Sequence, residues 1–582
     1  MAYVLADNII SPLGTTSEEN YLAAKAGKSG IHDYAPGTLG IPEGFTASWM
    51  ASDFEEMALE SAQKALAASG VDDSKDRVVF ILSSTKGAIE KLSVQDDDIQ
   101  EHGLSESAKR IASKLGVTTQ PIVVCNACIS GLSALILGER LLDMERYDYA
   151  IICGCDVPGR FIFSGFQSLR ALSSKPCRPF DMERFGLNLG AASATLVLGR
   201  EKPSEKAWQI GRGFVKNDAF HISAPSKTAE GLYDALVETL NLSDTQEETG
   251  LAEDINWAKE LALINAHGTA TLFNDQMESI AIQRAGLSNI PTNALKGYWG
   301  HTLGAAGILE TILCMKELDE HTIIGTLGFQ ELGVSGKVNI SAQNQSTEKE
   351  TFVKMLSGFG GCNATLLGTK KCSLQKGSDI SIKTCTWTKN HFVSITPSRV
   401  SVDGKPVEVD LSCDYPLTSL YKQYIGDYPK YYKMDGLSRL GFIASELLLK
   451  AEKDSNYWRD EKGQNFSKHE VDRAIILFNH SSSIASDKKF LESIVDEGNY
   501  FPSPSVFVYT LPNIVTGEIA IRNGYHGETS FYILENKDEE LMQTILEASF
   551  LDPQTESILG GWLNYDDNSH FEAEMYIYEK LG

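Results

Sequence analysis

Positive charge and long apolar runs are both scarce in this chain. It has 52 lysines and arginines against 78 aspartates and glutamates, which gives a formal net charge of -26 at pH 7. A protein with this negative charge repels a polyanion that approaches most parts of its surface. The composition therefore argues against nucleic acid as a partner. No segment approaches the roughly 20 apolar residues that a membrane-spanning helix needs, so we expect no membrane span.

The sequence also lacks signs of secretion. The N-terminal residues carry no basic stretch before an apolar one. The ten cysteines lie mostly inside apolar runs such as 151–155, where they are typical of reduced, buried thiols and not of a disulfide framework. These features predict a cytoplasmic protein.

What the chain does contain is a layered α/β pattern. Its 582 residues suggest two to four domains, and strand-like runs such as 78–82 alternate with helix-like runs such as 57–68. A polar, basic stretch follows residue 371. We therefore predict a first domain over 1–371, with halves of about 1–200 and 205–371, a linker over 372–382 and a further α/β domain over 383–582.

The order of elements in the last domain indicates a partial copy of the first domain. A helical run leading to a strand occurs at 50–84 and again at 434–478, and Ile111–Gly116 has a counterpart in 519–524. The place that matches Cys128 is then Asn536, and its neighbourhood holds no cysteine or serine. We expect the copy to lack a nucleophile.

Three short stretches carry reactive groups: 126–131 presents Cys128, 267–271 presents His267, and 296–301 presents His301. Cys128 should lie at a tight strand-to-helix turn, where helix N-terminal amides stabilise a thiolate. A buried structural cysteine is the ordinary alternative. Cys125 and Cys128 also match a metal or redox C-x-x-C motif, but no second ligand pair of suitable spacing follows, so we expect no metal.

Either histidine alone would more often be a satisfied core or surface group. His267 follows an apolar strand-like run, at the edge where open α/β sheets gather ligands. His301 precedes the small residues 304–307, which allow a helix start to pack closely. Both histidines beside a thiol turn indicate nucleophilic catalysis with a carbanion-stabilising site.

Residues 1–370 resemble the β-ketoacyl-acyl-carrier-protein synthases of the thiolase superfamily. The resemblance extends through Ile10–Gly14, Arg178-Pro179-Phe180-Asp181 and Gly358–Ala364. It implies a thiolase-like five-layer αβαβα fold with a C-terminal half-thiolase-like α/β domain. The site residues that it implies are Cys128, His267, His301 and Lys296 as the catalytic set, amides of Cys128 and Phe359 as the oxyanion hole, Phe359 as a gate, and Asp275, Glu278, Thr269 and Thr271 as supports.

The activity that the resemblance implies is an acyltransferase reaction without a permanently bound cofactor. Substrates would arrive on the phosphopantetheine of an acyl carrier protein. Cys128 would take the acyl chain, and the two histidines would stabilise the enolate left when a malonyl-carrier loses carbon dioxide. Lys296 would act through its charge on neighbouring carboxylates, with an ordinary surface lysine as the alternative.

The domain over 383–582 is similar to short chain-length-factor-like ketosynthase domains, which pair with an active synthase. The resemblance implies an intramolecular pseudo-dimer, which could dimerise further, with Tyr509–Asn513 near the interface. A plain structural turn is the alternative for these five residues. Such factors accompany synthases of aryl polyene and flexirubin-type pigments, so polyene elongation with a pathway ketoreductase and dehydratase is implied by analogy.

Some residues depart from the family pattern. Ala191, Ser357 and Cys362 replace the usual residues and put the shape of the pocket in doubt. A carrier-binding scaffold that no longer condenses, and a malonyl decarboxylase or loading enzyme, remain the alternatives. An acidic carrier needs a basic landing site, for which we consider Lys109, Arg110, Lys175 and Arg178.

Overall fold

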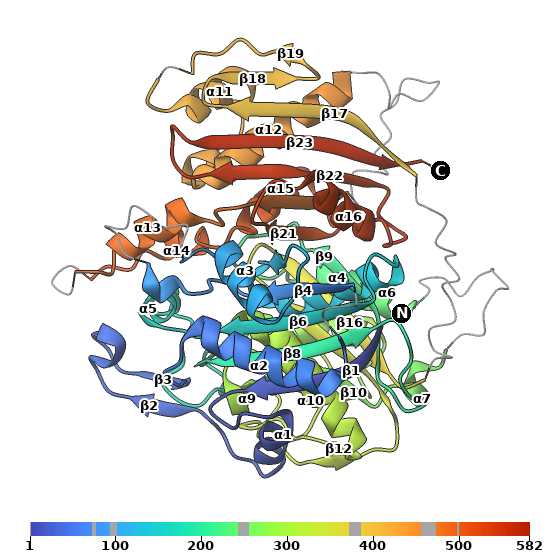
Figure 1. Cartoon of the computed structure of the whole chain (residues 1–582). Helices are drawn as coiled ribbons and strands as arrows, with labels where there is room; N and C mark the ends of the chain where they lie inside the picture. Colours follow the sequence, from blue (N-terminus) through green and yellow to red (C-terminus); the bar gives the residue numbers. More distant parts are fainter. Residues whose placement is uncertain are drawn as a thin grey trace.

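The computed structural model describes residues 2–72, 77–92, 102–242, 255–371, 386–411, 413–454, 473–496 and 500–581. We call residues 2–371 the N-terminal segment and residues 386–581 the C-terminal segment. Figure 1 shows the C-terminal segment, in orange and red, stacked above the N-terminal segment. The predicted linker lies outside the described residues.

The first sheet is mixed and is built around β4 (Val78–Ser83). This strand pairs in parallel with β5 (Ile122–Val124) on one side and with β6 (Tyr149–Asp156) on the other. Strand β8 (Ala192–Gly199) pairs antiparallel with both β6 and β1 (Ala2–Ile10). Strands β4, β5 and β8 are buried along their whole length, which is typical of a sheet that is covered on both faces.

The second sheet contains the second half of the N-terminal segment. Strand β16 (Cys362–Thr369) pairs antiparallel with β9 (Gln209–Asn217) and with β15 (Thr351–Ser357). Strand β10 (Leu263–Asn265) pairs in parallel with β15 and with β11 (Pro291–Asn293). Cys128 and His267 therefore come from different sheets, since Cys128 follows β5 and His267 follows β10.

Helices complete a five-layer arrangement. Helices α4 (Ser130–Asp143) and α10 (Ala306–Asp319) pack between the two sheets, where both are buried almost all round. The outer faces carry the remaining long helices of the segment: α2 (Phe54–Ser69) and α3 (Leu104–Lys114) on the first sheet, α6 (Glu230–Leu240) and α8 (Leu272–Arg284) on the side of the second. This αβαβα order confirms the predicted thiolase-like fold.

The C-terminal segment repeats the pairing scheme of the first sheet. Strand β20 (Ala474–Asn479) lies parallel between β21 (Thr529–Ile533) and β22 (Ser557–Tyr565). Strand β23 (Phe571–Lys580) then pairs antiparallel with β22 and with β17 (Trp387–Thr396). The order and directions match those of β5, β4, β6, β8 and β1.

Helix α16 (Glu539–Ser549) shows how half of a thiolase fold is stable without the other half. It occupies the place in the C-terminal segment that α4 occupies in the N-terminal segment, after the strand that matches β5. Helix α4 is buried almost all round, whereas α16 exposes Glu539, Glu540 and Gln543. Helix α4 packs between two sheets, whereas the C-terminal segment has one sheet for α16 to cover. The other face of α16 is polar and meets solvent.

The two segments share one continuous sheet. Strand β21 pairs antiparallel with β5 through Tyr532 opposite Val124 and Ile533 opposite Val123. Buried ion pairs also cross the boundary: Lys86 with Asp487, Arg140 with Glu528, and Lys216 with Asp552.

The described part of the chain contains no helix with the length and hydropathy of a membrane-spanning segment.

The Arg140–Glu528 pair should contribute strongly to the stability of this boundary. Its Nη1–Oε2 distance is 2.7 Å, and both side chains are at most 6% exposed. Glu528→Gln removes the charge that pairs directly with a buried guanidinium, so the free energy of unfolding should fall by about 3–5 kcal/mol. Urea unfolding followed by tryptophan fluorescence measures the change.

The matched control is Glu547→Gln, which breaks the more exposed Arg146–Glu547 pair at the same boundary. An exposed pair contributes at most about 1 kcal/mol. Equal effects of the two substitutions would contradict the view that burial makes the Arg140–Glu528 pair important.

Candidate active site

Cys128 lies in the turn between β5 and α4. The turn η4 (Ala127–Ile129) leads directly into the helix, and Ala127 has a φ of 48°, a left-handed conformation that is uncommon for a residue other than glycine. The backbone amides of Cys128 and Phe359 both act to lower the pKa of the thiol, which places these two N–H groups beside its sulfur. They form a pair of donors of the kind that stabilises an oxyanion.

Glycines bring this turn close to the turn that carries His301. A Cβ atom on Gly131 would lie 2.8 Å from the carbonyl oxygen of Gly304, and one on Gly307 would lie 2.4 Å from the amide nitrogen of Leu132. The N-terminal ends of α4 and α10 therefore touch backbone to backbone. The close packing that the small residues 304–307 predicted is present.

The backbone around His267 is held by the carboxylate of Glu278 on α8. Glu278 accepts hydrogen bonds from the amides of His267, at 2.6 Å, and of Gly268, at 2.8 Å. Asp275, one turn earlier, accepts from the amides of Phe180 and Ala270. Both acids were predicted as supports, and the structure places both under the histidine turn and its neighbour.

The tautomer of His301 is set by the following turn. The amide of Leu303 donates to His301 Nδ1 at 3.3 Å, so the ring proton belongs on Nε2. Nε2 is buried and has no protein partner among the described residues. It can therefore donate a hydrogen bond to a substrate oxygen.

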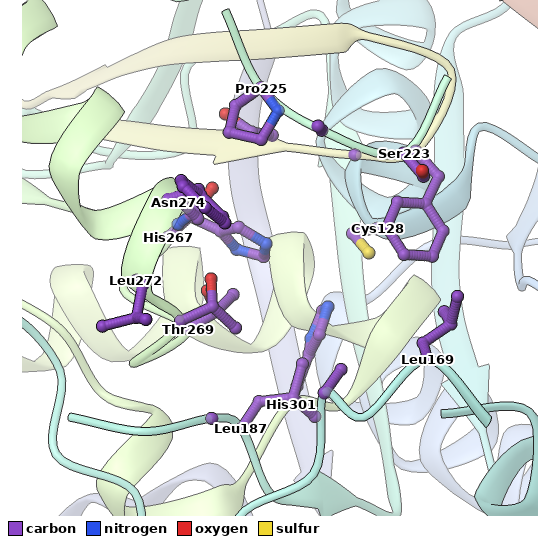
Figure 2. Close-up of a pocket in the computed structure, with 18 of the residues that line it drawn as sticks. Cys128, Leu169, Leu187, Ser223, Pro225, His267, Thr269, Leu272, Asn274 and His301 are labelled. Atoms are coloured by element: carbon purple, nitrogen blue, oxygen red, sulfur yellow. The ribbon is translucent and has the colours of Figure 1, made fainter. Parts of the chain in front are cut away.

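The three predicted groups converge on one cavity, as Figure 2 shows. The sulfur of Cys128 and one ring nitrogen of each histidine all lie within 4.8 Å of one another, and the two imidazole centroids are 4.9 Å apart. Three atoms at this spacing could also ligate a metal ion. Cys125 is not one of them, because its thiol contacts the carbonyl oxygen of Thr85.

A buried charge cluster lies near the histidines. Glu310 of α10 binds Lys296 Nζ at 2.8 Å and Lys354 Nζ at 2.6 Å, and all three side chains are at most 4% exposed. Burial alone would raise the pKa of Glu310, but the two ammonium groups hold it below its usual value. The structure therefore pairs Lys296 with the carboxylate of Glu310.

Both histidines are neutral near pH 7. Burial, reinforced by the charge of Lys296, holds the pKa of His267 and of His301 well below the usual value. A neutral imidazole can still donate one N–H to a developing negative charge, and it adds no net charge to a dry site.

The resting state of Cys128 differs from the sequence-based expectation of a stabilised thiolate. Burial raises the pKa of the thiol to about 12, and the opposing charge of Lys296 only partly offsets this. The backbone amides of Cys128 and Phe359 also lower the pKa of the thiol, but by less than burial raises it. The cysteine therefore rests as a neutral thiol beside neutral imidazoles.

The cavity in front of Cys128 has a volume of about 400 Å³. Thr269 and Thr271 line it and share a hydrogen bond of 2.9 Å. Its lining includes the exposed side chains of Phe185, Leu272 and Phe273. The entrance is thus largely apolar, although the exposed Arg170 also belongs to the lining.

Behind Cys128 lies a much smaller cavity of about 20 Å³. Phe359 borders both cavities, and its ring stacks on that of Phe166 at a centroid distance of 6.3 Å. Phe507, Thr510 and Leu511 of the C-terminal segment close the small cavity. The two segments therefore share the wall behind the thiol.

The basic residues that we considered for carrier docking are largely occupied. Lys109 pairs with Glu535, and Arg110 binds Glu55. Arg178 pairs with Asp181, while Lys175 is exposed.

Sequence reasoning missed Glu310, Lys354 and Phe507. It placed Asn513 near the interface, where the structure has it, but missed its hydrogen bond to the carbonyl oxygen of Phe359. Glu310 had a usable signal, because it is the one acid within the apolar run 305–315. Such a residue needs a buried partner. The aromatic at position 507 had no comparable signal.

Comparisons with known proteins agree with this architecture. The N-terminal domain model of the β-ketoacyl synthases matches residues 23–204, and their C-terminal domain model matches residues 209–330. A 3-oxoacyl-(acyl-carrier-protein) synthase 2 of Coxiella burnetii is 25% identical over 409 residues, which cover 62% of this chain and 96% of the relative.

Two solved structures extend the comparison. A ketosynthase–chain length factor named PfaC covers 100% of this chain and 78% of its own, with a TM-score of 0.73 at 12% identity. The ketosynthase ApeO, solved with its chain length factor ApeC from Xenorhabdus doucetiae, covers 63% of this chain and 97% of its own, with a TM-score of 0.53 at 24% identity. These likenesses concern the fold.

The high pKa of Cys128 predicts how the thiol responds to alkylation. Between pH 7 and pH 9 the rate of modification by iodoacetamide should rise roughly tenfold per pH unit without levelling off, because the reactive thiolate remains a minor species. Peptide mass spectrometry of the Cys128 peptide follows the rate, and Cys128→Ala serves as the blank. A plateau below pH 8 would show that the thiol is acidified instead.

Proposed function

Because the chain belongs to the β-ketoacyl synthase family, we propose that it condenses a malonyl-carrier with an acyl chain held on Cys128. The observation that carries this proposal is the convergence of a thiol, two neutral imidazoles and two backbone donors on one cavity. Substrates would reach the cavity on the phosphopantetheine arm of an acyl carrier protein.

The first step is acyl transfer. The sulfur of Cys128 attacks the thioester carbon, and the amides of Cys128 and Phe359 stabilise the oxyanion of the tetrahedral intermediate. The carrier thiol leaves and takes up the proton that Cys128 gives up. The neighbouring imidazoles can carry that proton, since neither is protonated at rest.

The second step forms the carbon–carbon bond. The bond between the malonyl carboxylate and its α-carbon breaks, carbon dioxide leaves, and the electron pair moves into an enolate. N–H groups of His267 and His301 stabilise the enolate oxygen. The α-carbon attacks the Cys128 thioester, the thiolate leaves, and the product is a β-ketoacyl-carrier that is two carbons longer.

The C-terminal segment would act as a built-in chain-length factor. It supplies Phe507, Thr510 and Leu511 to the small cavity behind Cys128, where a growing chain would extend. The neighbourhood of Asn536 contains no cysteine or serine, so this segment has no nucleophile of its own at the matching place. A polyene chain, processed between rounds by a ketoreductase and a dehydratase, is the product class that we propose.

Substitutions in the cavity should separate the two steps. Cys128→Ala should abolish the covalent acyl adduct and the elongated product, whereas His267→Ala and His301→Ala should retain the adduct and lower condensation by about 10²–10³-fold. Intact-mass spectrometry detects the adduct, and mass analysis of the carrier detects the product.

The alternatives give different outcomes in the same assay. No adduct from any acyl-carrier would favour a scaffold. Release of carbon dioxide from a malonyl-carrier without a longer product would favour a decarboxylase or loading enzyme.

The proposed role of the C-terminal segment predicts a change in product length. Phe507→Ala removes a ring that closes the small cavity, so the products should shift toward longer chains. The control is Phe501→Ala, which removes an exposed ring from the same segment and should leave the products unchanged. An unchanged product length for Phe507→Ala would contradict this role.

A further inference from the structure

Asn513 makes an unusual contact across the boundary between the segments. It occupies the N-cap position of α15 (Ile514–Asn523), where an asparagine side chain normally accepts a hydrogen bond from the first turn of the helix. Its side chain makes no such bond. Its Nδ2 donates instead to the carbonyl oxygen of Phe359, at 2.8 Å.

The surroundings make this contact well defined. Asn513 is 1% exposed, and its Oδ1 has no partner among the described residues. A buried amide that gives up its usual capping bond and leaves one atom unsatisfied costs free energy. The placement of Asn513 is therefore explained by its hydrogen bond to Phe359 and not by a need of the helix for a capping side chain.

That other end is the loop over 358–361, which we call the gate loop. Gly360 has a φ of +94°, and a Cβ atom there would lie 2.7 Å from Asn513 Nδ2. A Cβ atom on Gly517 would lie 2.5 Å from the carbonyl oxygen of Gly360. The first turn of α15 thus packs directly against the gate-loop backbone.

We propose that Asn513 is a positioning residue for the oxyanion hole and that it acts from the C-terminal segment. The carbonyl group of Phe359 accepts from Asn513 Nδ2 at 2.8 Å and also from the thiol of Cys362 at 3.3 Å. The shorter bond from Asn513 orients the residue whose amide faces the sulfur of Cys128. The C-terminal segment then supports catalysis directly, in addition to closing the small cavity. This inference rests on the proposed condensing activity.

The two steps of the reaction depend differently on this amide. Acyl transfer to Cys128 builds an oxyanion that the Phe359 amide stabilises. During decarboxylation of a malonyl-carrier, negative charge develops on the enolate oxygen. That oxygen lies beside the two histidines, away from the Phe359 amide. Loss of the Asn513 bond should therefore slow acylation more than decarboxylation, whereas general loss of folded protein would lower both together.

The test compares Asn513→Ala and Asn513→Asp with the wild type at pH 6 and pH 8. Asn523→Asp, at the other end of the same helix, is the matched control. Short-chain acyl-carrier and malonyl-carrier are the probes. Intact-mass spectrometry gives the acylation rate, and carbon dioxide release gives the decarboxylation rate, so each protein sample yields their ratio.

We expect Asn513→Ala to lower that ratio by about tenfold at both pH values, less than the loss of a whole oxyanion donor. With Asn513→Asp, an ionised carboxylate would face the Phe359 carbonyl at pH 8, whereas a protonated carboxyl group at pH 6 can donate to it. For Asn513→Asp, the loss in the ratio of acylation to decarboxylation should therefore be smaller at pH 6 than at pH 8. A residue with a merely structural role would not show this pH dependence.

Ratios within twofold of the wild type for both variants at both pH values would overturn the inference. A deficit in Asn523→Asp as large as that in Asn513→Asp would also overturn it. A wild-type protein that takes no acyl group would contradict the proposed function itself, so the two failures are distinguishable.

Discussion

The site depends on one packing constraint: two helix starts approach so closely that only glycine fits between them. Gly131 on α4 and Gly307 on α10 leave no room for a Cβ atom. The turn before α4 carries Cys128, and the turn before α10 carries His301. Since the two helices form the layer between the sheets, the distance from thiol to imidazole is set by the core and not by a flexible loop.

Burial then determines the protonation states. The same enclosure that raises the pKa of Cys128 lowers the pKa of both histidines. The result is a site without net charge on its reacting groups, beside a buried Lys296–Glu310–Lys354 cluster. In such surroundings, preorganised N–H donors stabilise developing negative charge more strongly than they would in water.

Much of this arrangement could be predicted from sequence. The apolar runs at 78–82 and 57–68 lie in β4 and α2, and motif residues far apart in the chain identified the three converging groups. The thiol state was predicted wrongly, because desolvation depends on the whole surrounding fold. The contacts of Glu310 and Asn513 could not be predicted, since their partners lie in other elements and, for Asn513, in the other segment.

The C-terminal segment completes the site by continuing the first sheet. Pairing of β21 with β5 brings the C-terminal segment against the first sheet, and Phe507 lines the small cavity beside Cys128. One protein therefore holds both walls of the small cavity at fixed geometry.

The most direct test of this account is a crystal structure of the protein after reaction with a short acyl donor. The account predicts an acyl group on the sulfur of Cys128, with its carbonyl oxygen about 2.7–3.1 Å from the amides of Cys128 and Phe359 and its chain directed toward Phe507. An acyl group on another residue, or a carbonyl oxygen turned away from both amides, would contradict it.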